Sequence, residues 1–160
     1  MSNLHPNPGW ENHYMQEIST LNTPIGTNIL GKHCILELYE CDKNKLNDES
    51  SIRYIISLGV KLSGATLLNL ISHRFEPQGV TGLALLAESH ISIHTWPESG
   101  YAAVDVFTCG DHTMPEKACE VIYKELAAKS LSFNIIQRQI PESIGNQIRE
   151  PNSIKDIKNL

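Results

Sequence analysis

The stretch "LLAESHISIHTWPESGYAAVDVFTCG", residues 85–110, decides the fold, because it contains two segments with the alternating pattern of β-strands. Apolar and polar residues alternate in "HISIHTW", residues 90–96, and again in "YAAVDVFTC", residues 101–109. The same stretch carries serine, histidine, glutamate and cysteine side chains, all of which can take part in chemistry. We therefore predict two neighbouring strands that carry a cluster of reactive groups within the β core.

The rest of the chain predicts four more strands and two helices. A first helix is predicted at residues 48–62, where isoleucines and a valine recur at helical spacing, with Gly64 as its C-terminal stop. A second helix is predicted after Thr113, which forms a capping box with Glu116 and is followed by Pro115 in the first turn. The further strands are predicted at residues 32–41, 65–75, 80–87 and 131–139.

This order of elements, β-α-β-β-β-β-α-β, predicts an α+β fold. We expect a two-layer sandwich of a mostly antiparallel sheet with both helices on one face. The other face then needs a cover, and a second copy of the chain is the expected one, giving a homodimer with the layers α-β-β-α. The domain is predicted to span residues 29–140, with a polar N-terminal extension at 1–28 and a polar C-terminal tail at 141–160.

Composition restricts the location and the partners of the protein. A length of 160 residues suits one domain. The formal net charge is −5 and no block of Lys or Arg stands out, so we predict no binding to nucleic acid or to an anionic membrane. The apolar runs are too short to span a bilayer and the N-terminus lacks the features of a signal peptide, so a cytoplasmic protein is predicted. The cysteines form no CxxC pair and are expected to be free thiols.

Taken by themselves, the residues of the cluster allow three interpretations. His90 and His94 are four residues apart, which suits zinc on a helix, but on a strand they lie about 13 Å apart, so no metal site is predicted. A hydrolase triad of Ser89, His94 and Asp105 lacks the GxSxG turn that such enzymes need. The third interpretation is that the polar side chains of residues 90–96 simply line a solvated face of the sheet, and the residues alone leave this open.

Longer segments resemble a known family. "ESHISIHTWPE" followed by "GYAAVDVFTCG" resembles the signature of prokaryotic S-adenosylmethionine decarboxylases. "GKH", "ELYECD", "SGAT" and "HRFEPQGVTG" also resemble segments of that family, in the same order, so that the resemblance covers roughly residues 30–140. It implies a self-processing proenzyme with a covalent pyruvoyl cofactor. Such an enzyme decarboxylates S-adenosylmethionine to the aminopropyl donor for spermidine synthesis.

The resemblance also implies the residues that carry the chemistry. Cleavage is expected between Glu88 and Ser89, after the Ser89 hydroxyl attacks the Glu88 carbonyl, in a strained and water-poor turn. It leaves a pyruvoyl group at the start of residues 89–160, and the substrate amine condenses with that group to a Schiff base. His94 matches the family's proton acceptor in processing. Cys109 matches its proton donor in catalysis.

Three further matches concern processing and substrate binding. Thr81, in "GVTG", stands where the family has a serine whose hydroxyl supports processing. Phe75 matches an aromatic residue that stacks on adenine. Glu98 matches a carboxylate that holds the ribose hydroxyls, and two oxygens suit a vicinal diol. The resemblance leaves two alternatives: an arginine or ornithine decarboxylase with the same fold and cofactor, and a non-catalytic paralogue that regulates a decarboxylase.

Overall fold

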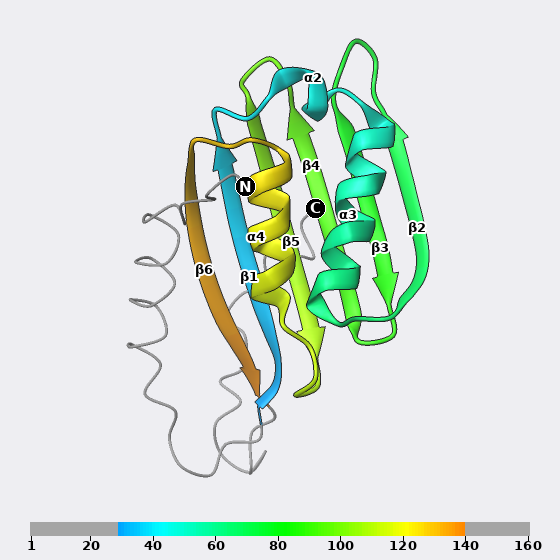
Figure 1. The fold of residues 1–160 in the computed structure, drawn as a ribbon, viewed down its shortest axis with the longest axis vertical. Helices are drawn as coiled ribbons and strands as arrows, with labels where there is room; N and C mark the ends of the chain where they lie inside the picture. The colour runs from blue at the N-terminus through cyan, green and yellow to red at the C-terminus, as the bar shows by residue number, and fades with distance from the viewer. Residues whose placement is uncertain (1–28, 140–160) are drawn as a thin grey trace, which may run out of the picture.

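A computed structural model describes residues 29–139, which form six strands and three helices (Figure 1). The predicted extension and tail lie outside these residues. Every strand and both helices expected from the sequence are present, and a short helix is added before the first of them. The elements are β1 (Ile29–Tyr39), α2 (Lys43–Leu46), α3 (Glu49–Ser63), β2 (Leu67–Arg74), β3 (Val80–Leu86), β4 (Ser89–Trp96), β5 (Tyr101–Cys109), α4 (Pro115–Glu125) and β6 (Ser130–Gln139).

The strands form one sheet in the order β2-β3-β4-β5-β1-β6. All neighbouring strands run antiparallel. Helices α3 and α4 lie side by side across one face of this sheet, as Figure 1 shows. The predicted two-layer α+β sandwich is therefore confirmed. The stretch that decides the fold supplies β4 and β5, the two central strands.

The hydrophobic core lies between the sheet and the two helices. Alternate residues of β4 and β5 face the helices, and the larger apolar ones among them are at most 1% exposed: Ile91, Ile93, Val104 and Val106. Burial of one such side chain stabilises the fold by about 1.5–3 kcal/mol. Helix α3 packs closely on β3, since a Cβ added at Gly82 would come within 2.5 Å of Ile56 Cδ1.

The start of α4 differs from the prediction, because the expected capping box does not form. The N-cap residue is Met114, which makes no side-chain cap hydrogen bond. The Thr113 hydroxyl instead donates to Thr108 Oγ1 at 2.9 Å, in the buried layer below β5. Glu116 pairs with Lys32 of β1 at 2.8 Å. Both members of the predicted box therefore tie the helix to the sheet rather than to its own first turn.

Thr95 joins three elements and provides a test of this packing. It is buried, and its hydroxyl accepts from the Val80 N–H of β3 at 2.8 Å and donates to the Leu46 carbonyl of α2 at 2.8 Å. Thr95→Val removes the hydroxyl and leaves two buried backbone groups without this partner. We expect the free energy of unfolding in urea to fall by about 1–3 kcal/mol. Thr95→Ser is the matched control, because it retains the hydroxyl. A valine variant as stable as the serine variant would contradict this account.

Candidate active site

The reactive side chains lie on the face of the sheet that points away from α3 and α4, here called the outer face. Residues paired across β4 and β5 share a face, and the register pairs His90 with Phe107, Ser92 with Asp105 and His94 with Ala103. These residues alternate with the buried ones that face the helices. The expectation that the cluster lies inside the core is thus wrong for a single chain, because the isoleucines and valines of the same strands occupy the helix side.

The linkage between Glu88 and Ser89 lies where β4 begins and β5 ends, which is the lower end of these two strands in Figure 1. The Cys109 N–H donates a hydrogen bond to the Glu88 carbonyl oxygen at 3.0 Å. Ser89 has a φ of 155°, a positive value that residues other than glycine seldom adopt and that costs free energy. A backbone N–H is thus aimed at the oxygen that would become negative if the Ser89 hydroxyl attacked this carbonyl.

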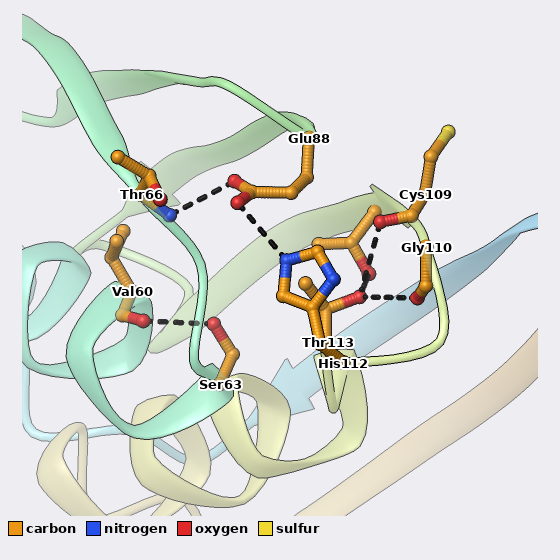
Figure 2. Close-up of polar contacts among 9 residues, drawn as sticks. Val60, Ser63, Thr66, Glu88, Cys109, Gly110, His112 and Thr113 are labelled. Carbon is orange, nitrogen blue, oxygen red and sulfur yellow. Dashed lines mark hydrogen bonds and ion pairs between the residues drawn. The ribbon is translucent and has the colours of Figure 1, made fainter.

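The Glu88 side chain is held by two loops, as Figure 2 shows. Its carboxylate accepts from the Thr66 N–H at 2.9 Å and pairs with His112 Nε2 at 3.3 Å. The Thr66 hydrogen bond, followed by that of His112, lowers the pKa of the Glu88 carboxyl below its usual value. Thr66 lies within the family segment "SGAT", but no sequence signal indicated His112. Contacts with two different loops thus hold Glu88, the residue that precedes Ser89, in place.

Cys109 occupies a tight place between β5 and β1. It is half-buried and pairs with Gly31, the first residue of the "GKH" segment. A Cβ added at Gly31 would come within 2.6 Å of the Thr108 carbonyl oxygen and 2.9 Å of Cys109 Sγ. A glycine at position 31 is therefore required by the close approach of the thiol and of the β5 backbone.

Thr81 and His94 form a second cluster. They are paired across β3 and β4, and Thr81 Oγ1 lies 2.9 Å from His94 Nδ1. The structure thus brings together two residues that the sequence assigned to processing. His94, however, is five residues from Ser89 along β4, a separation of about 16 Å at the rise of a strand. Within one chain His94 is therefore distant from the Ser89 hydroxyl.

Phe75 and Glu98 lie at the same end of the sheet as His94. Phe75 follows β2 and is 46% exposed, and its ring meets the His73 ring edge-on, with the ring centroids 4.7 Å apart. Glu98 lies in the turn between β4 and β5, and its carboxylate accepts from Gln78 Nε2 at 3.0 Å. The candidate residues therefore form two groups at opposite ends of the sheet. The Ser89 group comprises Glu88, Ser89 and Cys109, and the Glu98 group comprises Phe75, Thr81, His94 and Glu98.

Among residues 29–139, no three His, Cys, Asp or Glu side chains gather in a way that could hold a metal ion. None of the helices in this range is long and apolar enough to cross a membrane.

Comparison with known proteins identifies relatives of this chain. The family profile for S-adenosylmethionine decarboxylase matches residues 32–139. An S-adenosylmethionine decarboxylase proenzyme from Prochlorococcus marinus (strain MIT 9313) is 65% identical over 123 residues, which are 77% of this chain and 98% of the relative. A proenzyme of the same name from Methanococcus vannielii is 52% identical over 111 residues, 69% of this chain and 91% of the relative. The crystal structure of an adenosylmethionine decarboxylase from Aquifex aeolicus is 40% identical, with a TM-score of 0.68, and the match covers 75% of this chain and 99% of that one.

The packing at Gly31 gives a direct test of the site's construction. In Gly31→Ala the new methyl group meets the Thr108 carbonyl, so β1 and β5 must shift, and we expect a loss of about 1–3 kcal/mol in the free energy of unfolding. Gly59→Ala in α3 is the matched control. Its Cβ would meet Ala118 Cβ at 3.5 Å, an ordinary contact, and alanine favours the helix by about 0.5–1 kcal/mol. Urea unfolding measures both, and equal stability of Gly31→Ala and the native chain would refute the close approach.

Proposed function

The chain belongs to the S-adenosylmethionine decarboxylase family, and we propose that it becomes active by cutting itself between Glu88 and Ser89. Its reaction is the decarboxylation of S-adenosylmethionine, the activity for which its relatives are named. Neither alternative, arginine or ornithine decarboxylation or a non-catalytic regulatory role, is supported by those names. One observation carries the self-cleavage proposal: the Glu88 carbonyl accepts the Cys109 N–H directly beside the positive φ of Ser89.

The proposed cleavage begins with a reaction between two residues that are neighbours in the chain. The Ser89 oxygen attacks the Glu88 carbonyl carbon, the C–N bond breaks, and the amide becomes an ester. The Cys109 N–H stabilises the negative charge that gathers on the carbonyl oxygen during this step. Once the C–N bond is broken, the Ser89 backbone no longer has to hold the positive φ, so its cost in free energy is relieved. Elimination across the Ser89 Cα–Cβ bond then releases Glu88 as a carboxylate, and hydrolysis of the remaining dehydroalanine frees ammonia.

The surroundings of Ser89 suit the pyruvoyl group that this cleavage would leave. Ser89 is half-exposed at the start of β4, so a substrate can reach the new chain end that cleavage would create there. Cys109 lies beside it at the end of β5. When present, the group's ketone supplies the electron sink for loss of carbon dioxide. Cys109 is the proposed proton donor afterwards, since a thiol can donate a proton at neutral pH when its surroundings favour the thiolate.

The Glu98 group is the proposed binding site for the nucleoside part of the substrate. The exposed Phe75 ring offers a face on which adenine can stack. The Glu98 carboxylate, exposed in its turn, offers two acceptor oxygens to the ribose diol. Arginine and ornithine lack a diol, and a site built to bind hydroxyl groups discriminates against ligands without them. The same two residues therefore account for a preference for S-adenosylmethionine.

The distance between the two groups favours a site shared by two copies. In one chain, the Ser89 group and the Glu98 group lie at opposite ends of the sheet. If two copies pack with their outer faces together around a twofold axis, the Ser89 group of one meets the Glu98 group of the other. The same packing covers four apolar side chains that each chain exposes on its outer face: Ile71, Leu83, Leu85 and Ile136. The proposed enzyme is thus a homodimer with the layers α-β-β-α.

The cysteines bear on the proposed location. All four are free thiols, and Cys34, Cys41 and Cys119 are buried. Burial raises the pKa of Cys41 to about 11, so this thiol stays protonated and unreactive at neutral pH. A reducing compartment keeps such thiols free, and we place the enzyme in the cytoplasm.

Self-cleavage is tested by the intact mass of the purified protein. We expect two fragments, residues 1–88 and 89–160, with the second blocked at its N-terminus because the Ser89 amine is lost. Ser89→Ala should give only the full-length chain, since no hydroxyl remains to attack. A native chain that keeps its full, unmodified mass after prolonged incubation would refute self-cleavage.

The shared site is tested by mixing two inactive variants. Ser89→Ala lacks the attacking hydroxyl, and His94→Ala lacks the processing histidine, so each variant alone should remain uncut or be cut slowly. When the two are co-expressed, a mixed dimer places the intact His94 of one chain beside the intact Ser89 of the other. We expect the His94→Ala chain to be cut in the mixture, as measured by mass. If mixed dimers form and that chain stays uncut, the site does not combine residues of two copies.

A further inference from the structure

The Ser89 hydroxyl lies against a different histidine from the one that the sequence assigned to processing. Ser89 Oγ is 3.2 Å from Nδ1 of His90, its neighbour on β4. His94 is about 16 Å away along the strand and bonded to Thr81. We propose that His90 accepts the hydroxyl proton of Ser89 in the first step of self-cleavage. This inference rests on the proposed cleavage between Glu88 and Ser89.

The His90 ring is held in place by aromatic neighbours on the outer face. It meets the Phe107 ring of β5 nearly edge-on, with centroids 6.0 Å apart, and the His33 ring of β1 at 6.5 Å. His33 is fixed in turn, because its Nε2 lies 3.2 Å from Asp105 Oδ1. The Arg138 guanidinium lies 5.3 Å from the centre of the Phe107 ring. Three strands thus set the ring so that Nδ1 meets the serine hydroxyl.

The distance and the chemistry suit proton transfer. A general base must lie within about 2.6–3.2 Å of the atom whose proton it takes, and His90 Nδ1 meets this condition. Nδ1 accepts a proton when the ring hydrogen is on Nε2. As the bond from Oγ to the Glu88 carbonyl carbon forms, the hydroxyl proton moves to His90 Nδ1. As the C–N bond breaks, the same proton moves to the Ser89 nitrogen, which becomes an amine, and no other reactant is consumed.

This assignment divides processing between two histidines. His90 serves the conversion of the amide into the ester, because it alone of the two contacts the hydroxyl within the chain. His94, which belongs to the Glu98 group, is left for the later elimination. The two roles differ in the species that should accumulate when each residue is lost. Loss of His90 leaves the amide, whereas loss of His94 leaves the ester, and hydroxylamine cleaves esters but not amides.

His90→Phe is the decisive variant, because it keeps an aromatic ring against Phe107 and His33 but has no nitrogen. We expect its precursor to be cut about 10²-fold more slowly than the native chain, which is the lower end of the rate loss caused by removing a general base. The accumulated precursor should resist hydroxylamine. Tyr54→Phe is the control, since Tyr54 is exposed on helix α3, away from the outer face and both groups, and this change should leave the cleavage rate unchanged. Intact mass over time measures all three chains.

Chemical rescue separates proton transfer from a structural role. Free imidazole added to His90→Ala should restore cleavage, because it can occupy the vacated space and accept the proton. If His90→Phe is cut at the native rate, if its precursor is an ester that hydroxylamine cleaves, or if imidazole fails to rescue His90→Ala, the role of His90 is refuted while self-cleavage stands. If instead the native chain itself stays full-length, the proposed function fails.

Discussion

The helices cover one face of the antiparallel sheet, and the rest of the molecule depends on this asymmetry. Because side chains alternate along a strand, each strand gives one set of residues to the helices and the other to the outer face. In β4 and β5 the first set includes the isoleucines and valines that build the core. The second set carries the histidines, Ser92 and Asp105, and it remains accessible. A short stretch of sequence can therefore be both the centre of the fold and the place where chemistry happens.

The start of β4 carries the peptide bond at which we propose that the chain cuts itself. The antiparallel pairing brings the end of β5 beside Glu88, so that the Cys109 N–H meets the carbonyl oxygen. Thr66 and His112 restrain the Glu88 side chain. The Cys109 N–H polarises the Glu88 carbonyl, and the positive φ at Ser89 raises the free energy of the backbone beside it. The neighbouring strand β1 accommodates this by having Gly31 beside Cys109.

Periodicity predicted most of the fold, and the resemblance supplied the candidate site residues, which remain predictions. The alternation of residues 90–96 and 101–109 gave two strands that the structure confirms, and the isoleucines of residues 48–62 gave α3. Helix α2 was not predicted, since four residues are too few to show a period. The prediction of a capping box at Thr113 was wrong, because the Thr113 hydroxyl donates a hydrogen bond to Thr108 Oγ1 instead. Sequence alone could not tell that, within one chain, His94 is far from Ser89 while His90 contacts it, since that depends on face, register and side-chain direction.

The release of labelled carbon dioxide tests the central claim most directly. The purified, cut enzyme is given carboxyl-labelled S-adenosylmethionine, arginine or ornithine at equal concentration, with Ser89→Ala as the blank. We expect release from S-adenosylmethionine in clear preference to both amino acids, and none from the Ser89→Ala chain. Faster release from arginine or ornithine would contradict the proposed roles of Glu98 and Phe75. Equal release by the native chain and by Ser89→Ala would contradict the account of the reaction as a whole.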